Sequence, residues 1–290
     1  MNNKTSLYLF LLPVLSLLIS CGNDSNIPEG ITNSNDSIAL KQTISPSVVA
    51  PNYEMVISDI PFPFEILDNL YSKNVPFNKK AMNDIENIEN CNLYNSKAMN
   101  LGIYGADLAY AVTYEDFQSI GAYVKTIKRL ADELNIPYAF DQTMMDKYSK
   151  FKDNKDSLTK VVYDSYNQVD KSLKNDERVG MAALVATGSW LEGLYISTKT
   201  FIDAPKTKDN ASLYKVIYEQ KQSLKIVIKL LDEYKRDAYV SEVIEELNGI
   251  TSEYNNITSD VTMNEKQLIT LRTKIEALRN KIVEGVVITF

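Results

Sequence analysis

The chain has 290 residues, of which 44% are hydrophobic and 24% charged, so it can bury a sizeable core. Histidine is absent, which excludes Ser-His-Asp hydrolysis, Cys-His proteolysis and His-ligated zinc, haem or non-haem iron. Lys and Arg total 31 against 38 Asp and Glu, a net charge of −7. An acidic chain without a basic block binds nucleic acid poorly, so we expect no nucleic-acid partner.

Residues 1–20 have the pattern of a secretory signal. Lys4 supplies a positive start, and Leu7 to Ile19 is an apolar stretch shorter than the roughly 20 residues that span a bilayer. The junction Leu18-Ile19-Ser20-Cys21 resembles the lipobox of bacterial lipoproteins, in which aliphatic and small residues precede a cysteine. This resemblance implies a lipoprotein signal peptide over 1–20 and lipid chains on Cys21 that anchor the protein to a membrane.

The residues after Cys21 bear on where the anchor is placed. In the general lipoprotein sorting scheme, an Asp after the cysteine favours the inner membrane, and here the residue is Gly22. We therefore expect the outer membrane. The choice between its periplasmic face and the cell surface stays open, because Asp24 alone is acidic in the following stretch.

The second cysteine, Cys91, has no partner left once Cys21 carries lipid, so the sequence predicts no disulfide framework. Its acidic neighbourhood, Glu89-Asn90-Cys91-Asn92, should raise the pKa of the thiol and make it unreactive.

Composition divides the mature chain into a tether and a body. Residues 21–51 carry the lipidated cysteine and then Ser, Asn, Thr and Asp without an apolar period, which indicates a flexible, disordered tether. Residues 52–290 have apolar spacings of three and four, which predict one all-α domain, a bundle of about eight helices.

The first part of the body contains six predicted helices. The apolar pattern places them at about 63–73, 78–90, 96–112, 117–134, 156–174 and 177–203. Thr113 and Asp116 are expected to cap the fourth helix, and Pro137 to stop it.

Three antiparallel helices follow, at about 211–235, 239–258 and 264–284. Thr262 and Glu265 have the spacing of a capping box for the last of them. Two ion pairs at helical spacing, Asp232 with Arg236 and Arg272 with Glu276, are expected on exposed faces. Beyond Gly285 the residues 286–290 are β-prone and are interpreted as a docked tail.

Segments 96–112 and 177–203 stand apart because both are rich in Gly and Ala. Glycine inside a helix costs up to about 1 kcal/mol relative to alanine, so close packing should offset that cost. We therefore expect these two helices to pack against each other at the centre of the fold.

The run Asn-Leu-Gly-Ile-Tyr-Gly-Ala-Asp-Leu-Ala-Tyr at 100–110, with the helix ending at 130–136, resembles uncharacterised all-helical outer-membrane lipoproteins of Bacteroidota bacteria. The clear resemblance covers about 96–141. It implies an all-helical fold and an envelope location, and it implies no catalytic residue.

The same two helices carry the candidate site. Its residues are aromatic or acidic side chains in apolar surroundings: Tyr104, Asp107, Tyr110, Tyr114, Trp190, Glu192 and Tyr195. They could line a cleft in which the carboxylates hold a polar or cationic ligand. They could instead be core residues satisfied by hydroxyl and amide groups, which is the interpretation we favour. A hydrolase that uses the two carboxylates as acid and base is the third alternative.

The sequence contains no Gly-rich phosphate loop, dinucleotide fingerprint, EF-hand loop or CxxC pair, so we expect no cofactor and no metal. Taken together, the sequence predicts a non-catalytic binding or scaffolding lipoprotein. Its expected partners are the membrane, through Cys21, and an envelope protein. The alternative is a periplasmic or surface binder of small ligands that uses the cleft.

Overall fold

Helices make up the regular structure of residues 60–136, 140–175 and 178–286, which the computed structural model describes and which all belong to one compact unit. The α-helices are α2 (Pro63–Ser72), α3 (Tyr94–Thr113), α4 (Phe117–Glu133), α5 (Gln142–Lys150), α6 (Lys155–Asn175), α7 (Val179–Asp203), α8 (Leu213–Asp232), α9 (Ala238–Asn255) and α10 (Glu265–Val283). Three 3₁₀ segments are η1 (Lys79–Ala81), η2 (Ile85–Asn90) and η4 (Asp260–Thr262). Over these ranges there is no β-strand, which confirms the all-α class. The predicted signal peptide and tether, with Cys21, and the tail residues 287–290 lie outside the described residues.

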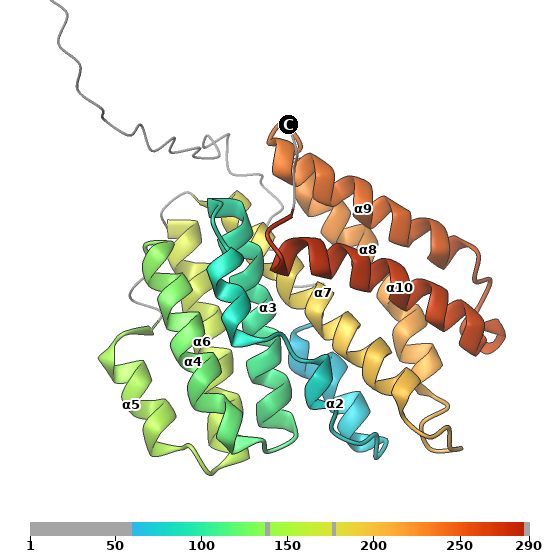
Figure 1. The fold of residues 1–290 in the computed structure, drawn as a ribbon, viewed down its shortest axis with the longest axis horizontal. Coiled ribbons are helices and arrows are strands. Elements are labelled where there is room, and N and C mark those ends of the chain that lie inside the picture. The colour runs from blue at the N-terminus through green and yellow to red at the C-terminus, as the bar shows by residue number, and fades with distance from the viewer. Residues whose placement is uncertain (1–59, 137–139, 176–177, 287–290) are drawn as a thin grey trace, which may run out of the picture. The chain divides into compact units, whose positions relative to one another are not determined.

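Helices α3 and α7 lie side by side at the centre of this unit (Figure 1). Helix α3 also contacts α2, α4, α6 and α10, and α7 also contacts α2, α6, α8 and α10. Nearly every residue of both helices is buried. The contact between α3 and α7 and their burial confirm the predicted central packing of the two segments. Their many small side chains allow neighbouring helices to approach from several directions.

The C-terminal helices α8, α9 and α10 lie together on one side of α7 (Figure 1), with α8 against α9 and α9 against α10. The apolar residues that predicted these helices are buried in one stripe on each. They are Leu213, Ile217, Leu224, Val227 and Leu231 on α8; Val240, Val243, Leu247, Ile250 and Tyr254 on α9; and Leu268, Leu271, Ile275, Leu278 and Ile282 on α10. Each such aliphatic side chain contributes about 1.5–3 kcal/mol when it leaves water, so these stripes are what hold the three helices together.

Helix α7 is, in the part of the chain that the structure describes, the one helix long and apolar enough to cross a membrane. Of its most apolar 18-residue window, 94% is buried against the rest of the body. That degree of burial is typical of the core helix of a globular fold.

The predicted helix at 78–90 is replaced by the two 3₁₀ segments η1 and η2. The side chain of Asn78 accepts a hydrogen bond from the amide of Lys80, and that of Asp84 accepts one from the amide of Glu86. Such local bonds compete with α-helical pairing, so the segment forms short turns instead. Helix α5, which the sequence analysis missed, begins at the cap Asp141, whose side chain accepts from the amide of Met144.

The predicted helix caps are confirmed only in part. The capping box of α10 consists of Asn264 and Gln267 rather than Thr262 and Glu265. Asp116 is the N-cap residue of α4, as predicted, but makes no side-chain capping bond, and Thr113 is instead the last residue of α3. Caps depend on backbone angles at a single residue, which apolar spacing does not determine.

Of the two predicted ion pairs, one is confirmed. Arg272 Nη1 and Glu276 Oε2 lie 2.7 Å apart, although both side chains are partly buried rather than exposed. Asp232 pairs with Lys235 rather than with Arg236. At the end of α10, Gly285 has a φ of 67°, as expected of a helix-ending glycine. A Cβ at this position would also overlap the carbonyl oxygen of Asn90. Both the positive φ and the lack of space therefore require glycine here.

Residues 52–290 without the tether are expected to fold on their own. The stripes described above form a continuous core that needs no disulfide. Circular dichroism should show strong helical bands and one cooperative melt, with the same midpoint in the presence of a chelator. A melt whose midpoint drops when chelator is added would contradict this expectation.

Candidate functional site

Two glycines allow the close crossing of α3 and α7. A Cβ on Gly102 would overlap the carbonyl oxygen of Val185, and a Cβ on Gly188 would overlap the carbonyl oxygen of Met99. Only a hydrogen atom fits at either position. The backbone of each helix therefore rests directly on the backbone of the other, which explains why both helices carry glycine in their interior.

The contacts along this crossing show that α3 and α7 run parallel. Although Gly102 meets Val185 at the glycine contact, the contacts advance in the same direction on both helices over the length of the crossing, from Met99 with Gly188, through Asp107 with Glu192, to Tyr110 with Thr200. The register brings the two candidate carboxyl groups, which are far apart in the sequence, to the same level of the core.

Glu192 extends from α7 toward α10, where it meets Arg279. Arg279 Nε donates to Oε2 of Glu192 at 3.0 Å, and its Nη2 donates to Oε1 at 2.9 Å, a two-point ion pair. The exposed fractions of the side chains are 0% for Glu192 and 8% for Arg279. The ring of Tyr195 lies 4.7 Å from the guanidinium carbon and covers one of its faces. The pair thus joins the last helix to the central helix away from solvent.

Asp107 completes this arrangement from α3. It is fully buried and lies within hydrogen-bonding reach of Glu192. Its Oδ1 accepts a bond from the amide of Asn83 at 3.2 Å, whereas Oδ2 finds no donor. Burial, and then the negative charge of Glu192, raise the pKa of Asp107 well above its usual range, although Arg279 acts in the opposite direction. We call Asp107, Glu192 and Arg279 the buried carboxyl cluster.

Tyrosines bind the irregular segment 75–84 to the helices beneath it. Tyr104 donates to the carbonyl of Asp84 (3.0 Å), Tyr114 to that of Val75 (2.9 Å) and Tyr123 of α4 to that of Asn83 (2.7 Å), while the hydroxyl of Tyr110 accepts from the amide of Asn78 (2.9 Å). The bonds to Val75, Asn78 and Asn83 satisfy backbone groups outside the helices, and the carbonyl of Asp84 also accepts from the amide of Asn87 in η2. Three of the predicted site residues, Tyr104, Tyr110 and Tyr114, therefore hold this segment over α3.

The remaining two aromatic candidates face other helices. Trp190 is fully buried, and its Nε1 donates to the side-chain oxygen of Gln220 on α8 at 3.1 Å. The hydroxyl of Tyr195 donates to Glu276 at 3.4 Å. The predicted set is thus divided: Asp107 and Glu192 meet each other, with Tyr195 at the edge of their cluster, while Trp190 lies elsewhere.

Sequence reasoning missed Arg279 and Asn83, which donate hydrogen bonds to the carboxyls, and Tyr123, whose hydroxyl donates to the carbonyl of Asn83. For Arg279 a signal existed. It lies four residues after Ile275 and three before Ile282, on the apolar stripe of its helix. A charged residue at such a position implies a buried partner of opposite charge. Glu192, a carboxylate in an apolar segment, is a candidate for that partner.

The hypothesis of a ligand cleft between α3 and α7 does not match the arrangement of the two helices. Their backbones touch, and both candidate carboxyls are fully buried. The small apolar pocket beside α3, which Gly105 and Tyr166 help to line, has a volume of about 20 Å³, enough for no more than about one water molecule. Gly105, a further glycine of α3, faces Tyr166 of α6 rather than α7.

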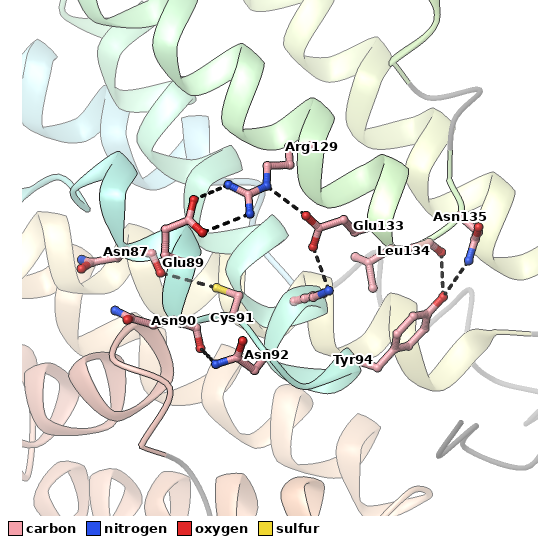
Figure 2. Close-up of polar contacts among 11 residues, drawn as sticks. Asn87, Glu89, Asn90, Cys91, Asn92, Tyr94, Arg129, Glu133, Leu134 and Asn135 are labelled. Carbon is pink, nitrogen blue, oxygen red and sulfur yellow. Dashed lines mark hydrogen bonds and ion pairs between the residues drawn. The ribbon is translucent and has the colours of Figure 1, made fainter. Parts of the chain in front are cut away.

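Cys91 lies apart from the carboxyl cluster, in the polar surroundings that Figure 2 shows. Cys91 is 5% exposed, and its thiol donates to the carbonyl of Asn87 at 3.8 Å. Burial, and then the charge of Glu133, raise the pKa of the thiol to about 11. The neighbouring Arg129 is occupied by Glu89 and Glu133, as the dashed lines in Figure 2 show. The thiol is therefore protonated at neutral pH, as the sequence predicted.

Comparisons with known proteins give no further assignment, since no protein-family model, curated protein or solved structure matches the chain.

Proposed function

We propose that the protein is a lipoprotein of the outer membrane, anchored through lipid on Cys21, whose helical body acts as a non-catalytic binding or scaffolding module. The observation that carries the proposal is the lipobox-like junction Leu18-Ile19-Ser20-Cys21, which lies at the end of an apolar stretch too short to span a bilayer. Several acyl chains on one cysteine would hold the body at the membrane essentially permanently, since each buried CH₂ contributes about 0.8 kcal/mol.

The interior of the body supports the non-catalytic part of the proposal. Both carboxyl groups that could have served as acid and base are fully buried, and Glu192 is bound at two points by Arg279. General acid–base catalysis requires a carboxyl group within reach of a substrate proton. In this arrangement the carboxyls instead connect α3, α7 and α10, which is a structural role.

Replacing Cys21 by alanine is expected to remove the anchor. Without the thiol no lipid can be attached, so the protein should leave the membrane fraction or accumulate as uncut precursor. Fractionation of cell envelopes with and without detergent measures this. A matched Cys91→Ala variant should behave as the wild type, since that thiol is buried in the body. If the Cys21→Ala protein is still processed and still needs detergent for release, the lipid anchor is disproved.

The binding or scaffolding role is tested by crosslinking in intact cells, followed by isolation of the native lipoprotein from solubilised membranes. A defined envelope protein that is crosslinked to the body, and absent from a Cys21→Ala control, would support the role. A body that is crosslinked to no protein, and that turns over a small molecule after purification, would contradict it.

A further inference from the structure

The buried carboxyl cluster contains one negative charge more than it contains positive charge. If all three groups are ionised, Asp107 and Glu192 contribute two negative charges against the single positive charge of Arg279. A net charge in surroundings with almost no water is costly, and proteins usually avoid it by protonating one group. The cluster is connected to solvent only at Arg279, whose side chain is 8% exposed.

Hydrogen bonding gives a second, independent reason to place a proton here. Both oxygens of Glu192 accept from Arg279, and Oδ1 of Asp107 accepts from the amide of Asn83. The remaining oxygen, Oδ2 of Asp107, is buried without a donor, and the carboxyl groups of Asp107 and Glu192 are neighbours that interact directly. Two carboxylates cannot bond to each other, since neither can donate. A proton on Oδ2 turns this repulsive contact into an O–H···O bond.

We propose that the folded protein holds one proton between Asp107 and Glu192, carried on Oδ2 of Asp107, and that the packing of α3, α7 and α10 weakens when this proton is lost. The neutral acid then donates to Glu192 and accepts from Asn83, so every polar atom of its carboxyl group is satisfied. The charges balance as well, with Glu192 against Arg279.

The other titratable groups that interact with Asp107 do not supply a competing charge near neutral pH. They are tyrosines on three helices: Tyr104 on α3, Tyr123 on α4 and Tyr166 on α6. Burial raises the pKa of all three, so they stay uncharged. The charged side chains with the largest effect on Asp107 are Glu192 on α7 and Arg279 on α10.

The direction of the pH effect follows from linkage. The unfolded Asp107 loses its proton near its usual pKa of 3.8, whereas the folded residue keeps it to higher pH. Above 3.8 the folded state thus binds more protons than the unfolded state. The stabilisation that the protonated Asp107 gives the folded state is complete below that pH. It is lost as the pH rises through the pKa that Asp107 has in the folded protein.

The test is urea unfolding of the full-length protein in mild detergent over a series of pH values, for the wild type and Asp107→Asn. Asparagine keeps the acceptor for Asn83 and a donor for Glu192 but cannot ionise. Between pH 4 and the folded pKa, the folding equilibrium constant of the wild type, divided by that of the variant, should fall up to about tenfold per pH unit. The exposed control Asp132→Asn should leave the pH profile of the wild type unchanged. A ratio that does not change with pH would overturn the proposal.

A second measurement decides the question even if Asp107→Asn does not fold. In wild-type protein labelled with carbon-13 at the aspartate carboxyl, one aspartate carbon should keep the chemical shift of a neutral acid at pH 7. The signal should disappear on unfolding, because the group then ionises. If every aspartate carboxyl of the folded protein has the shift of a carboxylate at pH 7, the proposal is wrong.

Discussion

Replacing Arg279 by methionine is expected to lower the free energy of unfolding by about 3–5 kcal/mol, the usual cost of removing one partner of a buried ion pair. Methionine preserves most of the apolar volume of the arginine stem, so little of the loss should come from a cavity. What remains is the Glu192 carboxylate, fully buried and without the two donors that now compensate its charge. Urea unfolding followed by circular dichroism measures the difference.

The matched control makes the same substitution at an exposed ion pair. Arg129 also contacts two carboxylates, Glu89 and Glu133, but its side chain is 47% exposed. Water solvates these charges once the pair is broken, so Arg129→Met should cost no more than about 1 kcal/mol. If Arg279→Met and Arg129→Met lower the free energy of unfolding equally, burial of the Glu192–Arg279 pair has no energetic consequence.

Replacing Gly188 by alanine is expected to cost about 3 kcal/mol or more, at the upper end of the range for overpacked cores. The added methyl group would overlap the carbonyl oxygen of Met99, which belongs to the backbone of α3 and cannot rotate away. Gly102→Ala should behave alike, because its methyl group would overlap the carbonyl of Val185. Denaturant midpoints of the two variants measure the effect.

Two other helical glycines supply the controls. At Gly121 in α4 and Gly249 in α9, an added Cβ meets nothing within 4 Å. Alanine there should stabilise the protein by up to about 1 kcal/mol, since it favours the helix. If Gly188→Ala is as stable as Gly121→Ala, helices α3 and α7 do not cross through their backbones.

Much of the fold could be predicted because apolar periodicity reports directly on burial. The stripes on α8, α9 and α10 and the small-residue character of α3 and α7 were sufficient to place five helices and one central contact. Segment 78–90 was mispredicted for a local reason, since side chains such as Asn78 and Asp84 bond to nearby amides and divert the chain into 3₁₀ turns. Periodicity contains no information on such bonds.

The candidate site was predictable in part. A carboxylate in apolar surroundings identified Asp107 and Glu192 as buried residues that need partners. The partners themselves come from elsewhere in the chain: Arg279 is 87 residues from Glu192, and Asn83 contributes only its backbone amide. Long-range pairings of this kind follow from helix register, which single-helix patterns do not reveal.

The tyrosines agree with the core interpretation rather than with the cleft. Tyr104, Tyr110 and Tyr114 were candidates either for lining a ligand cleft or for packing in the core. Their hydroxyls bond to the backbone of segment 75–84. Because this segment has little helical pairing of its own, the tyrosines supply the bonds that keep it on the core.

The measurement that tests the account most directly is a double-mutant cycle between Glu192 and Arg279, with free energies of unfolding for the wild type, Glu192→Gln, Arg279→Met and the double variant. If the carboxyl cluster is a structural element of the core, adding Glu192→Gln to Arg279→Met removes the unpaired buried charge. The double variant should then be more stable than Arg279→Met alone by about 1–3 kcal/mol. If the double variant instead loses the sum of the two single losses, the pair is not coupled and the account of the core is wrong.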